Sequence, residues 1–442
     1  MRVKEILSGW KKRKKRGPRA DRLVQKALHN LKEATGGKNT HLMHAEELVF
    51  SQQKQGAETA IRLISGLANA MSGGASGGGP AVVSVKWDGA PAIIAGTDPQ
   101  DGQFFVGTKG VFSKRDPKLN KKPSDIERFH PDKEDKDASS LRNKLKTALE
   151  HFPKLGIEGV LQGDLMFTPD TLKAQKIEGE EYLTFKPNTI TYAVPADSEL
   201  ADRIRNAKIG IVWHTAYDGE TVGDMTAQFG ASIEGMNEHP DVWFDDAVVT
   251  DVSGAGLSKA EAKPILQMLG ASSRTIKSMS NEDWALLTDS PIKKFGQQLL
   301  THVNRAVRAG KFTDASRFFN SFIEQIVATT DKEISTLKTG PEGPAAMRKM
   351  DDLQRAKDFV AENKEKLYNL YNLYMGIMEA KDELTKHLNK LMQMKAFIQQ
   401  PDGSYKVTPG EGVVVADHMG NAVKIVDRLD FSKANFAPKD FQ

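Results

Sequence analysis

The chain has 442 residues, of which 39% are hydrophobic and 27% charged, a composition typical of a soluble globular protein of two or three domains. The absence of cysteine excludes disulfide bonds, thiol catalysis and cysteine-based zinc sites. No apolar stretch is long enough to span a bilayer, so we expect a cytoplasmic protein without a membrane partner.

Residues 1–80 are predicted to form a basic arm followed by helices. The net charge is +4, whereas one short run alone carries six positive charges, so the rest of the chain is slightly acidic. That run consists of Lys11, Lys12, Arg13, Lys14, Lys15 and Arg16. It fits either an arm that binds nucleic-acid phosphates or a solvated tail. A helical pattern runs from about His41 to Met71, and a glycine-rich loop, Ser72–Pro80, follows it.

Residues 81–254 are predicted to be rich in strands. Their irregular spacing does not fit repeating βαβ units and favours a mixed, mainly antiparallel sheet. The expected strands are Ala81–Lys86, Ala92–Ala95, Phe104–Gly107, Gly159–Phe167, Tyr182–Phe185, Thr189–Val194 and Ile209–Thr215. One helix, Leu141–Phe152, interrupts them after a charged loop from Ser113 to Ser140.

Residues 255–400 are predicted to form an inserted helical domain. The helical signal lies in Pro291–Ala309, Asp314–Leu337 and Ala345–Met394, where apolar residues at helical spacing predict a packed core. Strand character returns in residues 401–442, at Tyr405–Val407, Gly412–Ala416 and Ala422–Val426. We therefore expect an α+β fold in which the helical block is separable from the sheet domain and its two ends lie close together.

The pentapeptide Lys86-Trp87-Asp88-Gly89-Ala90 follows the first expected strand. A lysine on a rigid strand end, partly desolvated, becomes a nucleophilic amine, and a following glycine allows the backbone to turn sharply. The alternative is a surface lysine before an Asp-Gly hairpin turn.

Four further signals follow in order along the chain. Gly107-Thr108-Lys109-Gly110 is a glycine-flanked turn that carries a cation. Leu161–Leu165 includes the acid Asp164, and Thr189–Val194 carries Tyr192 on an apolar strand. The last signal is Glu411-Gly412 before three valines, followed by Lys424 within Ala422–Val426.

This ordered set resembles the covalent nucleotidyltransferases, which comprise the ATP-dependent DNA and RNA ligases and the mRNA capping enzymes. Their motif I is Lys-x-Asp-Gly, motif III ends in an acid after glycine, motif IV is Glu-Gly before apolar residues, and motif V is a lysine on a strand. The resemblance covers about residues 81–217 and 405–436. The chain also looks like uncharacterised ligase-like proteins of large tailed phages, for which the expected compartment would be the host cytoplasm.

The resemblance implies a nucleotidyltransferase domain of ligase type and a role for each matching residue. Lys86 would attack the α-phosphorus of ATP, and Glu411 would bind Mg²⁺. Asp164 would either ligate Mg²⁺ or contact the ribose, and the resemblance favours the ribose. Lys109 and Lys424 would neutralise phosphate charge, and Tyr192 would stack on the purine unless it is a core tyrosine. Nucleotide contacts are also implied for the motif I residues Val85, Trp87, Asp88 and Gly89.

Three features depart from the family pattern. Ala90-Pro91 stands where many ligases have an arginine two residues after the glycine, Lys109 replaces a common arginine, and motif V has one lysine, with Lys433 as a distant substitute. No room is expected after Phe436 for the β-barrel module of DNA ligases and capping enzymes. This favours the RNA-ligase branch or an inactive descendant.

The predicted function is an ATP-dependent polynucleotide ligase that joins 5′-phosphate to 3′-hydroxyl ends through a lysyl-AMP intermediate, on RNA in preference to DNA or a nicked duplex. The alternatives are a capping-type enzyme and a catalytically degenerate nucleic-acid-binding or interaction protein. Two weaker patterns remain. His41 and His44, with Glu46 and Glu47, form either a metal site or one packed helical face, and His214 has no partner that the sequence identifies.

Overall fold

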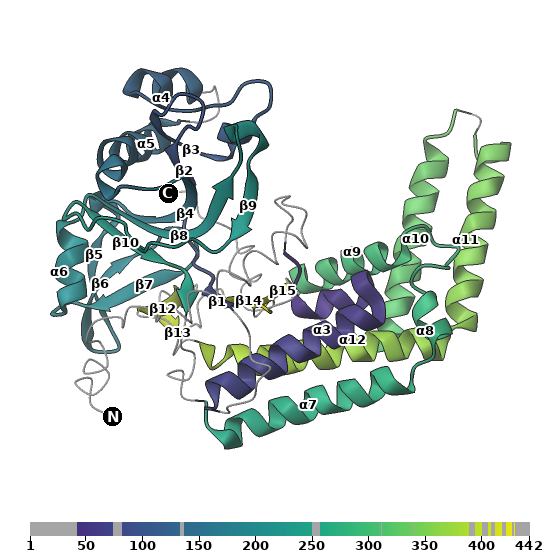
Figure 1. The fold of residues 1–442 in the computed structure, drawn as a ribbon. Coiled ribbons are helices and arrows are strands. Elements are labelled where there is room, and N and C mark those ends of the chain that lie inside the picture. The colour runs from purple at the N-terminus through teal and green to yellow at the C-terminus, as the bar shows by residue number, and fades with distance from the viewer. Residues whose placement is uncertain are drawn as a thin grey trace.

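The computed structural model divides the chain between a sheet-rich half and a helical body, with a small sheet between them (Figure 1). The structure describes residues 42–73, 82–132, 137–249, 257–310, 312–338, 340–388, 394–399, 405–407, 412–417, 421–426 and 428. The expected α+β class is confirmed: the pairing is mainly antiparallel, and β8 with β10 is a parallel pair.

The small sheet between the two halves is built from segments far apart in sequence. Its order is β11-β1-β14-β15, with bounds Val248–Val249, Val82–Val85, Val413–Ala416 and Ala422–Ile425. Within it, Ser84 pairs with Val414, which pairs with Lys424. Because paired residues of antiparallel strands lie on one face, Ser84 and Lys424 share a face, opposite the valines that enter the main core.

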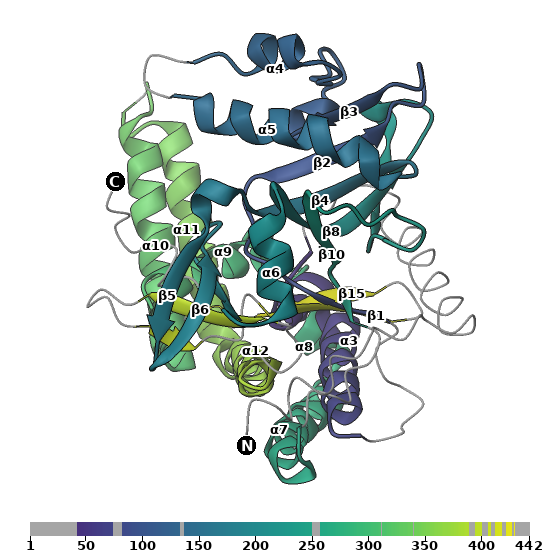
Figure 2. The same cartoon turned by 90° about the vertical axis from the view of Figure 1, so that its left-hand side faces the viewer.

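The larger sheet has six strands in the order β10-β8-β4-β2-β3, with β9 on the far part of β8. The strands are β2 (Ala92–Thr97), β3 (Phe104–Gly107), β4 (Val160–Phe167), β8 (Ile209–Asp218), β9 (Thr226–Phe229) and β10 (Val242–Asp246). Helices α4 (Pro123–Phe129) and α5 (Ser139–His151) lie over this sheet and share an apolar core with it (Figure 2).

A third sheet of five strands has the order β13-β12-β7-β6-β5. The strands are β5 (Lys173–Ile177), β6 (Glu180–Phe185), β7 (Thr191–Pro195), β12 (Lys395–Gln399) and β13 (Tyr405–Val407). The short helix α6 (Glu199–Asn206) follows β7, with Ser198 as its N-cap. Because β12 pairs with β7, the chain that returns from the helical body rejoins a sheet of the first half.

The helical body packs around α3 and α12. Its helices are α3 (Leu48–Met71), α7 (Lys259–Ser278), α8 (Asn281–Ala285), α9 (Phe295–Arg308), α10 (Ala315–Ser335), α11 (Pro344–Glu362) and α12 (Lys364–Thr385). Helix α9 approaches α3 so closely that a Cβ on Gly296 would lie 2.3 Å from the carbonyl oxygen of Phe50. One continuous apolar core joins these helices to β1, β14 and β15.

Several expectations about the elements are confirmed and others are corrected. The bounds of β3 and β13 are those expected. The strand before the helical block, β11, lies beside β1 in the small sheet, whereas the strand that follows the block, β12, lies in the third sheet. The expected helix Ala345–Met394 is two helices that meet at Asn363. The expected division at residue 80 is wrong for α3, because this helix packs against α7, α9 and α12 within the helical body.

Candidate active site at the end of strand β1

Lys86 follows β1, the strand that lies between β11 and β14. Backbone hydrogen bonds hold this end of the strand from both sides: Val85 N donates to Ala247 O at 2.7 Å, and Lys86 N donates to Gly412 O at 2.8 Å. Val85 itself is buried in the main core. The backbone that carries the Lys86 amine is therefore fixed by two neighbouring segments.

Four charged side chains meet around this strand end. Burial lowers the pKa of the Lys86 ammonium to about 8. The negative charges of Asp164 and Asp88 oppose this shift, and the positive charge of Lys424 adds to it. The structure thus brings together the acids of motifs I and III and the lysine of motif V. A pKa of about 8 leaves a useful fraction of neutral amine at neutral pH.

Asp88 anchors the turn after Lys86. Its buried carboxylate accepts hydrogen bonds from Asn188 Nδ2 at 2.7 Å, Thr189 N at 2.6 Å and Ile190 N at 2.7 Å. Both carboxylate oxygens are occupied by these donors, which precede β7. Asp88 therefore ties motif I to the third sheet. No sequence signal identifies Asn188 and Ile190 as its partners.

We expect Asp88→Ala to lower the free energy of unfolding by about 3 kcal/mol, because two backbone N–H groups would remain buried without an acceptor. Chemical denaturation monitored by circular dichroism measures this loss. Asp116→Ala, which removes an exposed carboxylate, is the control and should leave the unfolding midpoint unchanged. Equal midpoints for the two variants would show that Asp88 does not hold the turn.

Tyr192 lies beneath motif I as a core residue. Its hydroxyl accepts a hydrogen bond from Asp88 N at 2.7 Å, and its ring lies 5.2 Å from Trp87 and 5.6 Å from Phe185 between centroids. The residue is fully buried, so it has no exposed ring face for a purine. This placement corrects the stacking role expected of Tyr192: its ring and the buried Trp87 support the turn from the core side.

Gly89 allows motif I to lie directly on β4. A Cβ at this position would lie 2.5 Å from the Cβ of Asp164 and 2.9 Å from the carbonyl oxygen of Leu165. The next residue continues the contact, because Ala90 N donates to Leu165 O at 3.0 Å. The glycine is therefore required by close packing against the strand that carries Asp164.

Asp164 is partly exposed and has a histidine beside it. Its Oδ1 lies 3.5 Å from Nε2 of His214 on the neighbouring strand β8, because the ladder pairs Asp164 with Val212. The structure thus supplies the partner of His214 that the sequence could not identify. The charge of Asp164 also acts on Lys86, where it opposes the lowering of the lysine's pKa.

The two predicted phosphate-binding lysines lie in different settings. Lys109 is exposed and begins the 3₁₀ helix η3 (Lys109–Phe112), directly after β3. Gly107 pairs with Ile94, so Lys109, two residues further along the chain, lies near the end of the sheet where β2 begins. Lys424 is half-buried on β15, and burial lowers the pKa of its ammonium, while the Glu47 charge opposes this shift.

The predicted metal ligand Glu411 and the basic run Lys11–Arg16 lie outside the described residues. Gly412, the second residue of motif IV, is described: its φ is +100°, and a Cβ there would lie 2.2 Å from the carbonyl oxygen of Ile425. Only glycine fits this position. Within the part of the chain that the structure describes, no three His, Asp or Glu side chains group closely enough to hold a metal ion by themselves.

Comparison with known proteins places the chain in a family without assigning its chemistry. The model of a family of unknown function, DUF6267, matches residues 39–439, so the chain belongs to that family. No curated protein and no solved structure matches it. Among the helices of the described residues, none combines the length and apolar character needed to cross a membrane.

Proposed function

We propose that this protein is an ATP-dependent polynucleotide ligase of the covalent nucleotidyltransferase type, acting on RNA in preference to DNA. The observation that carries the proposal is the partly neutral Lys86 amine, held at a strand end with Asp164 and Lys424 beside it. The order of the small sheet adds support, because β1, β14 and β15 bring the motif I, IV and V segments side by side.

The proposed reaction has three displacements at phosphorus. The neutral Lys86 Nζ attacks the α-phosphorus of ATP, a P–N bond forms, and pyrophosphate leaves. An oxygen of a 5′-phosphate then attacks the same phosphorus and releases the lysine. Finally the 3′-hydroxyl attacks the 5′-phosphorus and AMP leaves. Positioning and charge neutralisation dominate such transfers, which suits Lys424 and Lys109 as phosphate contacts.

A magnesium ion fits this residue set as a partner of the nucleotide. Mg²⁺ binds through one or two carboxylates together with substrate phosphates, so a group of three protein ligands is not required. Asp164 is a partly exposed carboxylate close to Lys86, whereas both oxygens of Asp88 already accept hydrogen bonds. Glu411, next to Gly412, would be the second carboxylate. When bound, the ion would neutralise charge on the triphosphate.

The decisive experiment is to incubate the purified protein with α-³²P-ATP and Mg²⁺ and to test for a radiolabelled protein on a denaturing gel. A covalent label that pyrophosphate removes supports the proposal, and the absence of a label contradicts it. α-³²P-GTP in a parallel reaction distinguishes the ligase from a capping-type enzyme. Joining of nicked RNA and DNA substrates by the labelled protein then identifies the nucleic acid.

We expect kcat/KM for self-adenylylation, measured at ATP concentrations well below KM, to rise about tenfold per pH unit below about pH 8 and to level off above it. The neutral amine is the nucleophile, and its fraction grows until the pH exceeds the pKa of Lys86. Asp164→Asn should move the half-rise to lower pH, because the carboxylate stabilises the ammonium. A rate that is constant between about pH 6 and about pH 9 would contradict Lys86 as the titrating group.

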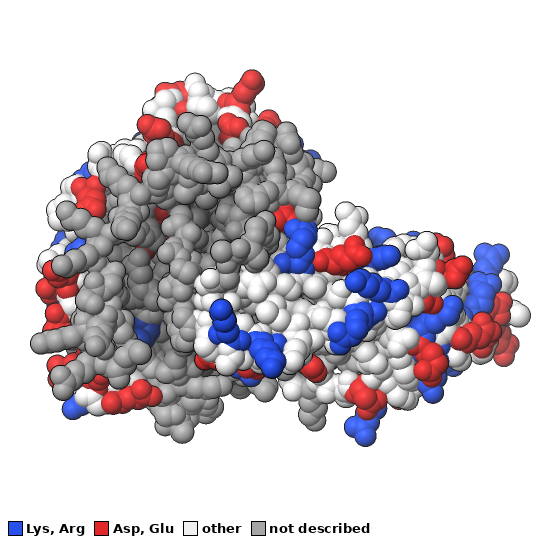
Figure 3. Space-filling model, turned by 60° about the horizontal axis from the view of Figure 1, so that its bottom comes forward, with Lys and Arg blue, Asp and Glu red and all other residues white. Residues whose placement is uncertain are grey.

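A second candidate function is binding to nucleic acid without chemistry. It is favoured by β15, whose single lysine is Lys424 where the ligases usually have two. On the face of the helical body in Figure 3, the described cations and acids are interspersed and do not form one basic patch. In this alternative Lys11–Arg16 would attract nucleic-acid phosphates. The labelling experiment separates the two functions, since this one predicts binding without a covalent adduct.

A further inference from the structure

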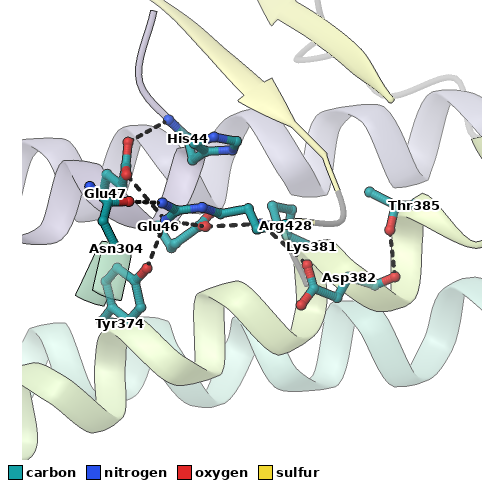
Figure 4. Close-up of polar contacts among 9 residues, drawn as sticks. All are labelled: His44, Glu46, Glu47, Asn304, Tyr374, Lys381, Asp382, Thr385 and Arg428. Carbon is teal, nitrogen blue, oxygen red and sulfur yellow. Dashed lines mark hydrogen bonds and ion pairs between the residues drawn. The ribbon is translucent and has the colours of Figure 1, made fainter. Parts of the chain in front are cut away.

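A buried ionic cluster lies beside the motif V strand and has no part in the chemistry described so far. We call Glu46, Glu47, Lys381 and Arg428 the Glu46–Arg428 cluster (Figure 4). Lys381 Nζ lies 2.9 Å from Glu46 Oε1, and Arg428 Nη1 lies 3.1 Å from Glu47 Oε1 and 3.5 Å from Glu46 Oε1. Neither Glu46 nor Lys381 has exposed surface.

This cluster joins three parts of the chain. The acids lie in η2 (Ala45–Glu47), directly before α3; Lys381 lies on α12, and Arg428 follows β15. Arg428 also contacts Tyr374 of α12, at 3.2 Å from the hydroxyl, and the side-chain oxygen of Asn304 on α9. The stretch after β15 is thus held to three elements of the helical body by one guanidinium.

The same segment holds Lys424 by its backbone. Lys424 N donates to Met43 O at 2.9 Å, and His44 forms a parallel bridge with Lys424 at the edge of the small sheet. Lys424 is therefore fixed between the residues that lead into Glu46 and Glu47 and the residues that lead to Arg428. Charged groups act on its ammonium from three sides: Glu47 before α3, Arg428 after β15, and Lys86 after β1.

Burying four charged side chains is costly, and apolar residues of similar size often stabilise a protein as well or better. A buried ionic cluster is therefore weak support for a purely stabilising role. The fixed contacts of the cluster and its position beside Lys424 fit a role in holding this lysine in place. A lysine that neutralises phosphate charge must lie at a defined position relative to the phosphate.

We infer that Glu47 and Arg428 are positioning residues that hold Lys424 against the nucleotide phosphates, so the helical body forms part of the nucleotide site. This inference rests on the proposed function for the role of Lys424. It reverses the expectation that the helical block is separable from the chemistry, since α12 and α9 contribute to the contacts that fix Arg428. Catalysis would then depend on the packing of α9 and α12 against the segment that follows β15.

The test is Glu47→Gln, which removes the charge and keeps an oxygen that accepts hydrogen bonds. Glu333→Gln is the matched control, because Glu333 pairs with Lys349 on α10 and α11 within the helical body, outside the proposed site. Two quantities are measured: the pH at which Lys424 becomes half-reactive towards acetic anhydride, by peptide mass spectrometry, and KM and kcat for self-adenylylation.

In Glu47→Gln we expect Lys424 to become reactive at lower pH, because the negative charge that stabilises its ammonium is lost. We expect KM for ATP to rise about tenfold with a smaller change in kcat. A purely structural role would reduce the amount of active protein and leave KM unchanged, so KM is the measurement that separates positioning from stability. The control should match the parent protein in both measurements.

Unchanged Lys424 reactivity and unchanged KM in Glu47→Gln would overturn the inference. If the parent protein takes no label from ATP, the proposed function fails, while the Lys424 titration still decides whether Glu47 sets the charge of this lysine. If Glu47→Gln does not fold, Arg428→Lys is used in its place. This variant keeps the positive charge, but a lysine cannot contact the acids of η2, Tyr374 and Asn304 at the same time, so KM should rise. A parental KM in a folded Arg428→Lys protein would also overturn the inference.

Discussion

Lys86→Ala is expected to abolish the AMP adduct completely. The proposed first step forms a bond between Nζ of this residue and the α-phosphorus. Alanine has no side-chain nucleophile that could form this bond. Lys86 combines a pKa lowered to about 8 by burial with a backbone held by Ala247 and Gly412. Intact-protein mass spectrometry after incubation with ATP and Mg²⁺ measures the adduct, and peptide mapping assigns it.

Two further variants make this result specific. Lys86→Arg keeps a cation at the strand end but cannot act as a neutral amine at physiological pH, so it should also lack the adduct. Lys424→Ala should slow the reaction and still yield an adduct on Lys86, because it removes phosphate neutralisation and not the nucleophile. An adduct on any residue of Lys86→Ala would mean that the nucleophile lies elsewhere.

Lys381→Met is expected to lower the free energy of unfolding by about 3 kcal/mol, because it removes the shorter of the two cation contacts of buried Glu46 and leaves only the 3.5 Å contact with Arg428. Lys381 has no exposed surface, and its Nζ lies 2.9 Å from Glu46 Oε1. The neighbouring charges hold the pKa of Lys381 above its ordinary value in spite of its burial, so the ammonium persists in the fold. Urea denaturation followed by circular dichroism measures the loss.

The double variant Glu46→Gln with Lys381→Met should recover most of that stability, because both charges are then removed together. Lys366→Met is the surface control: Lys366 lies 3.3 Å from Asp283 and is half exposed, so its loss should change the free energy by less than about 1 kcal/mol. If Lys381→Met and Lys366→Met unfold at the same urea concentration, the buried pair does not stabilise the helical body.

The sequence predicted the strands that carry the site because their signals are local. Short runs of valine bounded by glycine or charged residues, such as Val413–Ala416 after Gly412, identify buried strands. The order of the motifs then predicted that Lys86, Asp164 and Lys424 would meet, and the structure brings these three together. Glu411 stays a prediction, as do the roles in nucleotide binding.

What the sequence could not predict depends on contacts between distant segments. Glu46 and Lys381 are 335 residues apart, and no sequence signal pairs these two among 62 lysines and arginines and 58 acids. The stacking role given to Tyr192 failed because an aromatic residue on an apolar strand looks the same whether its ring meets a ligand or the core. Strand β5 (Lys173–Ile177) was missed because most of its residues are exposed and polar.

The position of β1 between β11 and β14 has a consequence for protein synthesis. Lys86 is made early, but one neighbour of its strand is translated about halfway along the chain and the other only near the end. Until residues 412–425 leave the ribosome, the lysine lacks the Gly412 carbonyl that holds its backbone and the Lys424 charge beside it. A nascent chain therefore carries the proposed nucleophile without its surroundings, and the proposed reactivity towards ATP would arise as a late event, when the last strands close the sheet.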